Sequence, residues 1–329
     1  MSGQWQAWKR KYGGEALRPM AEQVALVRTG SAVAWLDDLR LMRVEGADAE
    51  AFLQGQLSSD VRDLSETRAS YSTYSSAKGR MLASFLMWKS QGAFHVLLAA
   101  DVAEAVAKRL TMFVMRSKVR IELVPSESVA LLGVSLGAAA DLSISSESLF
   151  VSQQESIQAV SLPGGGAVLV LADDECLENT LGQLNAEAVS AQAWQIRDID
   201  AGIAWVRQAT QEQFVPQMAN MELIGAVSFQ KGCYPGQEIV ARTQYLGKLK
   251  RRLYRIELAA PAAVGDKLYS PHVPDQSIGM VAAICQTVEG TFEGLAVVQS
   301  ACWEEGVMLN SIGGVKLVCR KLPYELPDA

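Results

Sequence analysis

Apolar residues in the first 245 positions follow helical spacing in some segments and strand-like spacing in others. In residues 47–57, the apolar positions fall on one face of a helix, namely Ala49, Phe52, Leu53 and Leu57. Short apolar or alternating runs between the helices are typical of strands. We therefore expect an alternation of helices and strands, with strands at residues 70–76, 81–88, 94–99, 119–124 and 128–135.

A longer helix is predicted to start at Asp101, because Glu104 follows at the spacing of a capping box. Its predicted buried face consists of Val102, Val106, Leu110 and Phe113. The polar stretch 141–156 and the three glycines at 164–166 are expected to be loops. The glycines precede the strand-like run AVLVLA rather than a helix, which is the wrong order for a dinucleotide-binding turn.

Further helices are predicted around Leu177, Leu181 and Leu184 and over residues 190–203. After about residue 245 the pattern changes, and no long helix is expected. Strand-like runs separated by glycine-containing turns indicate an antiparallel β-barrel or sandwich, with strands at 249–258, 277–288, 291–299 and 313–320.

Composition and charge narrow the class of protein. The chain has 329 residues and a net charge of −6, which argues against nucleic-acid binding over its whole surface. Its longest apolar stretch, residues 129–140, is too short to span a bilayer and predicts a buried strand that runs into a helix. The first residues lack the apolar core of a secretory signal. We therefore expect a cytoplasmic protein without a membrane partner.

Two histidines exclude a histidine-rich metal site, and five cysteines argue against a disulfide framework. Cys285, Cys302 and Cys319 are each 17 residues apart and lack the paired spacing of a zinc site, so they are expected to be small buried strand residues. Cys176 follows three acidic residues, which disfavour a thiolate. No metal site is predicted.

Cys233 lies in a different setting, the segment FQKGCYPGQEIVART at 229–243. Lys231 precedes it by two residues, and Pro235 suits the first turn of a helix that residues 237–242 can continue. A nearby cation and a helix N-terminus both favour the thiolate. Spacing alone leaves two interpretations open: a reactive thiol, or a tight turn in which Cys233 is merely small.

The run KGCYPGQE at 231–238 resembles the K-G-C-[FY]-x-G-Q-E motif of the YgfZ family. That family is related to the glycine-cleavage T-protein and to the N-terminal domain of the GTPase MnmE. GADAEAFLQGQLSSDV, AKGRM and FVPQMANMELIGAVSFQKGC resemble further family segments in the same order, so the resemblance runs from about residue 24 to 325. It implies an α+β, T-protein (GcvT)-like fold. Two interleaved α+β domains over residues 20–244 would surround a folate cavity, and an antiparallel β-barrel would follow over residues 245–325.

The resemblance also implies site residues. Of two family tryptophans associated with tetrahydrofolate, one matches Trp194, and the other position is occupied by Leu39. Trp35 is nearby in sequence, but on a continuous strand it would lie roughly 13 Å from Leu39. Asp200 matches a T-protein glutamate that binds the pterin. Of the motif residues, Cys233 and Lys231 are implied at the reactive centre, whereas Tyr234, Gln237 and Glu238 are implied near the folate. Gln237 and Glu238 are also expected to orient the loop.

One departure from the T-protein pattern concerns catalysis. The positions of its aspartate pair are occupied by Leu82 and Ala83, so no carboxylate is available there for aminomethyl transfer. We therefore do not expect a true aminomethyltransferase. The basic residues after the motif could attract a folate tail, RNA or an acidic partner, or could form a solvated barrel edge, which we favour: Lys248, Lys250, Arg251, Arg252 and Arg255.

The resemblance implies a tetrahydrofolate-binding protein that supports iron–sulfur cluster assembly or repair and thereby tRNA modification. Its expected partners are folate and iron–sulfur proteins or their assembly factors, and no direct contact with nucleic acid is expected. Two alternatives remain. The protein could be a folate-dependent one-carbon transferase of another specificity, or a non-catalytic adaptor that folate stabilises.

Overall fold

The computed structural model describes residues 17–154, 157–171, 174–245 and 249–327. Its contacts divide the chain into two compact units, each assembled from alternating segments of the sequence. The first unit consists of Met1–Ala49, Arg62–Ser70 and Leu86–Arg197. The second consists of Glu50–Val61, Tyr71–Phe85 and Asp198–Ala329. The predicted boundary near residue 245 falls within the second unit.

The first unit contains a six-stranded sheet with the order β11-β1-β7-β10-β9-β8. Its strands are β1 (Ala32–Trp35), β7 (Ala130–Val134), β8 (Val151–Gln154), β9 (Ile157–Ser161), β10 (Ala167–Leu171) and β11 (Glu187–Val189). β1 and β11 run parallel, and the other neighbours run antiparallel. β7 and β10 are buried along their whole length, which explains their unbroken apolar sequences.

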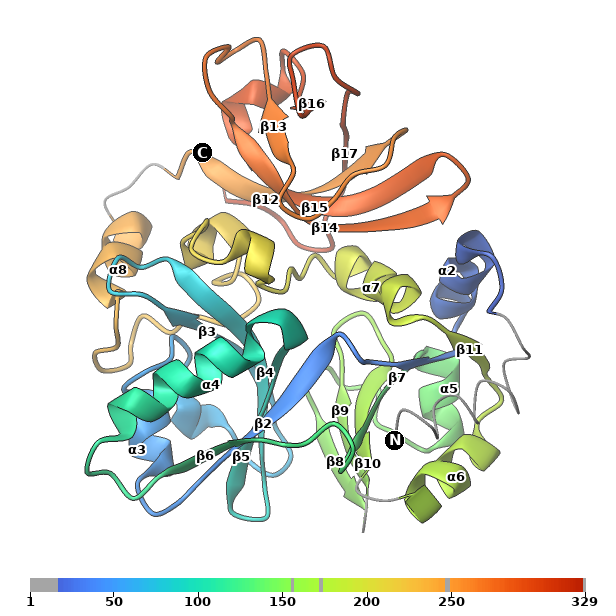
Figure 1. The fold of residues 1–329 in the computed structure, drawn as a ribbon, viewed down its shortest axis with the longest axis vertical. Helices are drawn as coiled ribbons and strands as arrows, with labels where there is room; N and C mark the ends of the chain where they lie inside the picture. Colours follow the sequence, from blue (N-terminus) through green and yellow to red (C-terminus); the bar gives the residue numbers. More distant parts are fainter. Residues whose placement is uncertain (1–16, 155–156, 172–173, 246–248, 328–329) are drawn as a thin grey trace. The chain divides into compact units, whose positions relative to one another are not determined.

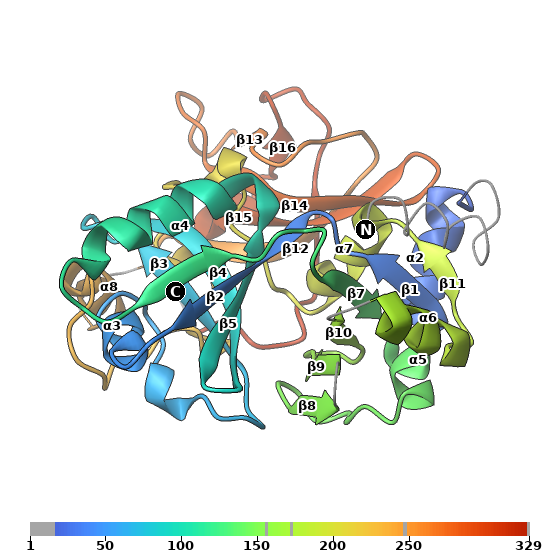
Figure 2. The same ribbon diagram turned by 60° about the horizontal axis from the view of Figure 1, so that its bottom comes forward.

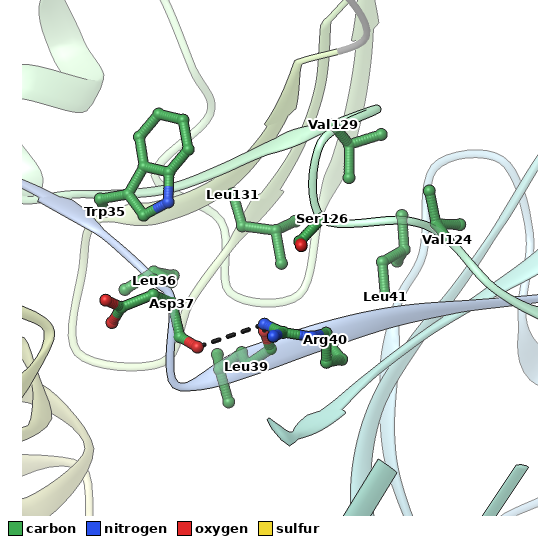
Figure 3. Close-up of a pocket in the computed structure, with 10 residues that line it drawn as sticks. All are labelled: Trp35, Leu36, Asp37, Leu39, Arg40, Leu41, Val124, Ser126, Val129 and Leu131. Atoms are coloured by element: carbon green, nitrogen blue, oxygen red, sulfur yellow. Dashed lines mark hydrogen bonds between the residues drawn. The ribbon is translucent and has the colours of Figure 1, made fainter. Parts of the chain in front are cut away.

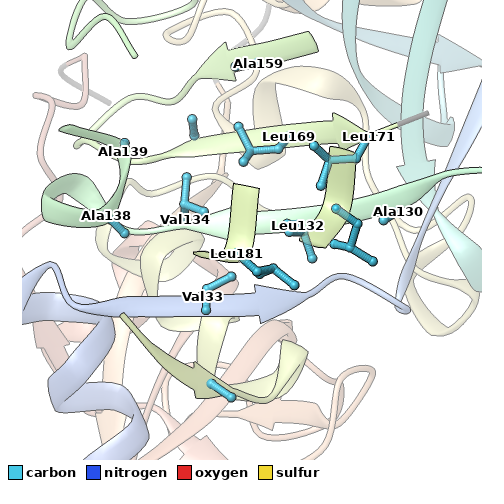
Figure 4. Close-up of a cluster of buried hydrophobic side chains, with 13 residues drawn as sticks. Val33, Ala130, Leu132, Val134, Ala138, Ala139, Ala159, Leu169, Leu171 and Leu181 are labelled. Carbon is cyan, nitrogen blue, oxygen red and sulfur yellow. The ribbon is translucent and has the colours of Figure 1, made fainter. Parts of the chain in front are cut away.

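Helices cover this sheet and complete its core. They are α2 (Met20–Thr29), α5 (Leu136–Asp141) and α6 (Asp174–Gln183). Figure 4 shows Leu132 and Val134 of β7 beside Leu169 of β10, with Ala138 of α5 and Leu181 of α6 in the same buried cluster. The apolar stretch 129–140 therefore forms a buried strand that continues into a helix, as predicted. The described residues contain no helix long and apolar enough to cross a membrane.

A five-stranded sheet has the order β3-β4-β5-β2-β6. Its strands are β2 (Leu39–Glu45), β3 (Ser70–Ser75), β4 (Met81–Ser90), β5 (Ala93–Ala99) and β6 (Arg120–Leu123). Helix α4 (Ala100–Val114) packs against β2, β5 and β6 (Figures 1 and 2). The predicted helix at 47–57 is shorter in the structure, where α3 spans Ala49–Gln54.

Two details of α4 differ from the sequence prediction. Its N-cap is Ala99, and no side chain caps it, so Asp101 lies in the first turn instead. Val102, Val106 and Leu110 are buried as predicted. Phe113 is 45% exposed, with the Arg109 guanidinium over its ring, because the helix reaches beyond the sheet at this end.

The C-terminal part of the second unit forms an antiparallel sheet with the order β16-β13-β14-β15-β12-β17. Figure 1 shows that it is strongly curled, as expected for the predicted β-barrel. Its strands are β12 (Arg251–Leu258), β13 (Lys267–Tyr269), β14 (Gly279–Val288), β15 (Thr291–Gln299), β16 (Met308–Leu309) and β17 (Val318–Arg320). Cys285 is buried in β14, but Cys302 lies in the 3₁₀ helix η4 (Ser300–Trp303) and Cys319 is exposed.

Short helical segments connect the sheets of the second unit: η2 (Gln208–Thr210), η3 (Pro216–Ala219) and α8 (Gln237–Tyr245). A further one, η1 (Val61–Asp63), follows α3, and α7 (Ala191–Asp200) agrees with the helix predicted over 190–203. The predicted loop at 141–156 is wrong in part, because it contains β8. The polar sequence of this edge strand has no apolar alternation to indicate it.

Candidate functional site

Lys231 anchors the loop of the KGCYPGQE motif within the second unit. Its side chain is buried, and Nζ donates hydrogen bonds to the backbone carbonyls of Gln54, Leu57 and Ser59 at 2.7, 2.6 and 2.9 Å. These carbonyls lie at the end of α3 and in the following turn, where helical carbonyls lack partners within the helix. The three contacts match the three donors of an ammonium group. The predicted effect of Lys231 on the Cys233 thiol stays a prediction.

A close backbone contact fixes the other end of the loop. Gly236 has φ +81°, and a Cβ atom on it would lie 2.5 Å from the Ser76 carbonyl oxygen and 2.7 Å from Gly79 Cα. Gly79 has φ +69°, and a Cβ there would lie 2.9 Å from the Ile239 side chain. Both positions therefore require glycine, and the motif packs against the turn of AKGRM.

Cys233 lies between these two anchors as an exposed free thiol, whereas its neighbour Tyr234 is buried. The Tyr234 ring centre is 5.3 Å from Lys231 Nζ. Burial raises the pKa of Tyr234 to about 12, and its hydroxyl has no hydrogen-bond partner among the residues described. The predicted helix after Cys233 is confirmed as α8. It begins only at Gln237, so the thiol precedes the first turn.

The two remaining motif residues have different surroundings. Gln237 Nε2 donates to the Lys231 carbonyl at 3.5 Å and so contacts the loop. Glu238 is 81% exposed and pairs with Arg242 one turn later at 3.3 Å. In this part of the structure, Gln237 therefore holds the loop while Glu238 faces solvent.

Asp200 is the last residue of α7, and its carboxylate contacts the C-terminal sheet. Oδ1 lies 2.6 Å from Nη2 of Arg255 on β12, and the same nitrogen lies 2.6 Å from Oε2 of Glu293 on β15. Asp200 is 32% exposed, whereas Glu293 is only 13% exposed. Arg255 therefore bridges a less exposed carboxylate and a more exposed one.

Trp194 and Leu39 both lie in the first unit. Trp194 is buried against β7, where a Cβ on Gly133 would lie 2.4 Å from the indole ring. Leu131, two residues earlier on β7, faces the same side of the sheet as Gly133. Leu131 and Leu39 line one cavity.

This cavity has a volume of about 240 Å³ and lies beside the turn between β1 and β2 (Figure 3). Its walls are mainly apolar, and its polar lining comes from Asp37, Arg40 and Ser126. The Arg40 guanidinium donates to the Asp37 carbonyl at 3.2 Å. Pockets for drug-sized ligands measure roughly 300–1,000 Å³, so this cavity suits a ring system rather than a whole extended ligand.

Trp35 also lines this cavity. The expectation that Trp35 and Leu39 lie far apart on one strand is wrong, because β1 ends at Trp35 and β2 begins at Leu39. Between them the Asp37 amide donates to the Trp35 carbonyl at 3.1 Å, and the Leu39 amide donates to the Leu36 carbonyl at 3.4 Å. A tight turn therefore replaces the extended segment that the distance assumed.

The T-protein aspartate positions carry no acid in the structure either. Leu82 and Ala83 are buried in β4, and the Leu82 carbonyl accepts a hydrogen bond from Gln211 Nε2 at 2.9 Å. Their side chains offer no group that could transfer a proton.

The triple-glycine loop has a structural partner in the first unit. Gly164, Gly165 and Gly166 all have positive φ, and the buried Arg197 of α7 donates to the carbonyls of Pro163 and Gly165. An arginine of the same unit therefore satisfies two carbonyls of this loop.

The expected solvated edge of basic residues after the motif is wrong for three of its members. Arg252 pairs with the buried Glu222, Arg255 pairs with the carboxylates described above, and Arg251 donates to the Ser277 carbonyl. Lys250 is exposed, and Lys248 lies outside the described residues. Arginines on a half-buried strand need acceptors within the protein. The alternation of arginines with apolar residues in this segment could therefore have predicted internal partners.

Sequence reasoning missed Glu293 and the bridging role of Arg255. The positions of β12 and β15 were predicted, but their pairing was not, and the structure sets Glu257 opposite Glu293 in this pair. The described residues contain no group of three or more His, Cys, Asp or Glu that could hold a metal ion.

The arrangement of sheets and helices is that of the glycine-cleavage aminomethyltransferases. The crystal structure of glycine cleavage system aminomethyltransferase T from Bartonella henselae matches with a TM-score of 0.75 at 16% identity, over 92% of this chain and 89% of that one. This similarity confirms the predicted T-protein-like α+β fold.

Sequence similarity identifies the family within that fold. The chain is 30% identical over 311 residues to the tRNA-modifying protein YgfZ of Sodalis glossinidius (strain morsitans), a match that covers 89% of this chain and 93% of that protein. This chain belongs to the YgfZ family. No protein-family model matches it.

Proposed function

We propose that this protein acts in the cytoplasm, binds tetrahydrofolate or a derivative, and supports iron–sulfur cluster assembly or repair and thereby tRNA modification. Its membership of the YgfZ family supports the link to tRNA modification. The observation that carries the proposal is the exposed Cys233 thiol on a loop that Lys231 and Gly236 hold at both ends. Iron–sulfur proteins or their assembly factors are the partners that this thiol would meet.

The residues present suit a folate. A carboxylate accepts hydrogen bonds from the N–H edge of an aminopterin, and Asp200 offers a partly exposed one beside Arg255. Leu39 lines a cavity of a size suited to a ring, and the buried Trp194 packs against the same face of β7 as Leu131, which also lines the cavity. When bound, tetrahydrofolate would supply a carrier for one-carbon groups.

The thiol is suited to transient chemistry rather than to storage of a cluster. A bound iron–sulfur cluster needs four ligands, usually cysteine thiolates, and Cys233 has no such group of ligands around it among the described residues. Cys233 would therefore exchange with a sulfur, disulfide or cluster species that another protein carries. Its exposed position allows that contact.

Calorimetric titration tests the folate part of the proposal. We expect the purified protein to bind tetrahydrofolate, Asp200→Ala to lose roughly tenfold or more in affinity, and Trp194→Ala to bind more weakly. Thermal melting should show that both variants still fold. The absence of heat with every folate form, together with no competition between them, would refute folate binding.

The fold supports one alternative, a folate-dependent one-carbon transferase, because its structural neighbour is an aminomethyltransferase. The buried Leu82 and Ala83 count against aminomethyl transfer of the T-protein type. Formation of methylene-tetrahydrofolate from a panel of amines decides between the two functions. Turnover that Cys233→Ala leaves intact would favour the transferase.

A further inference from the structure

One nitrogen atom of Arg255 contacts two carboxylates that come from different elements. Nη2 lies 2.6 Å from Asp200 Oδ1 at the end of α7 and 2.6 Å from Glu293 Oε2 on β15. The contact with Glu293 is a charge-assisted hydrogen bond, and the contact with Asp200 is an ion pair.

The Arg255 side chain is held between two carboxylates that differ in their exposure to solvent. Its side chain is 21% exposed, and its Nε is buried without a hydrogen-bond partner among the residues described. Glu293, at 13% exposure, is the more buried of the two carboxylates. Glu293 therefore fixes the guanidinium from the sheet side, and the guanidinium in turn fixes the more accessible Asp200.

The position of Asp200 makes such a partner necessary. The C-terminal end of a helix carries partial negative charge and disfavours a carboxylate. Arg255 compensates this charge, with Nη2 at 2.6 Å from Asp200 Oδ1.

We propose that Arg255 is a positioning residue for the folate site: it orients Asp200 so that this carboxylate accepts hydrogen bonds from the N–H edge of the bound pterin. This inference rests on the folate binding proposed above. It gives β12 and β15 of the C-terminal sheet a role in ligand affinity.

A purely stabilising ion pair would behave differently. Exposed ion pairs contribute little to stability, and the bidentate pair of Arg320 with Glu257 on the same sheet is an example of one. Arg320→Gln is therefore a matched control, because it removes an arginine–glutamate pair of β17 and β12 without contact to Asp200.

The experiment measures tetrahydrofolate affinity by calorimetry for Arg255→Gln, Arg255→Lys and Arg320→Gln, with thermal melting of each variant. We expect Arg255→Gln to weaken binding roughly tenfold. Arg255→Lys should restore part of the affinity, because lysine keeps the positive charge on a shorter side chain. Arg320→Gln should bind like the unchanged protein.

A double-mutant cycle separates positioning from general structure. In an Asp200→Asn background, Arg255→Gln should cause no further loss of affinity, because its effect passes through Asp200. If Arg255→Gln does not fold, Glu293→Gln loosens the same guanidinium and should give a smaller loss that Asp200→Asn also abolishes.

The outcomes distinguish the two proposals. Wild-type affinity in Arg255→Gln, or an equal loss with and without Asp200→Asn, would overturn the role of Arg255 and leave folate binding intact. If the unchanged protein binds no folate, the proposed function fails and the positioning role fails with it.

Discussion

Lys231 is a buried cation whose acceptors are backbone carbonyls from a distant part of the sequence. The motif resemblance singled out this lysine, but its partners could not be predicted, because 172 to 177 residues separate them from it. The spacing of residues along the chain predicts contacts within one helix or strand. It does not predict contacts between elements that are distant in the sequence. The same limit applies to Asp200. The family resemblance identifies this residue but does not indicate that Arg255 is its ion-pair partner.

Removal of the Lys231 ammonium should destabilise the protein. Lys231→Met leaves three carbonyls without their donor, which should cost about 2–5 kcal/mol of unfolding free energy. Urea denaturation checks this value. Lys250→Met, at an exposed position, serves as the control and should change the free energy by less than about 0.5 kcal/mol. Equal stability of the two variants would contradict the anchoring role.

His95 should make the protein less stable in acid. Burial, and secondarily the charge of Arg43, lowers the pKa of His95 from 6.5 to about 4. Between these values the unfolded chain takes up a proton that the folded protein refuses. Stability is therefore unaffected by His95 above pH 6.5 and falls as the pH drops toward 4, by about 3 kcal/mol in all.

His95→Gln should remove this loss, since glutamine does not titrate. The measurement is the free energy of unfolding in urea between pH 7 and pH 4. The control is His272→Gln, which replaces a histidine at the surface. An unchanged pH dependence in His95→Gln would show that other groups cause the acid sensitivity.

At the scale of elements, the motif loop and the AKGRM turn form one local structure in which glycines touch. Gly236→Ala would force a side chain into φ +81° and place its Cβ against the Ser76 carbonyl. We expect a loss of at least about 2 kcal/mol and a displaced Cys233 loop. Gly232→Ala lies in the same motif, with no atom within 4 Å of the added carbon, and should be nearly neutral. Thermal unfolding of both variants tests this contrast, and equal melting temperatures would refute it.

Strands with a strongly apolar sequence could be predicted from the sequence, whereas a strand with a polar sequence could not. β4, β7 and β10 consist of nearly unbroken apolar residues and were recognised from them. β8 lies at the edge of its sheet, and its sequence VSQQ has no apolar alternation that would predict a strand. The predicted strand at 313–320 is reduced to β17, because a turn takes the first residues of the segment and Lys316 forms only an isolated bridge with Met308.

At the scale of the whole molecule, the chain passes repeatedly between two compact units, so each unit is assembled from segments that are distant in the sequence. The pattern of apolar positions predicts alternating helices and strands followed by an antiparallel β-barrel or sandwich, but the division into units depends on contacts that no local pattern encodes. The family was recognisable from KGCYPGQE and the segments that precede it. The T-protein-like fold by itself does not fix the reaction, since Leu82 and Ala83 show that a catalytic pair is absent from an otherwise similar framework.

The central claim is that this protein supports iron–sulfur enzymes through the Cys233 thiol. It is tested most directly by the activity of an iron–sulfur enzyme in cells that lack the gene, after complementation with Cys233→Ala or with Cys319→Ala, which removes another exposed free thiol. We predict that Cys319→Ala restores the activity fully and that Cys233→Ala does not, at equal protein levels. Full restoration by Cys233→Ala would contradict the account.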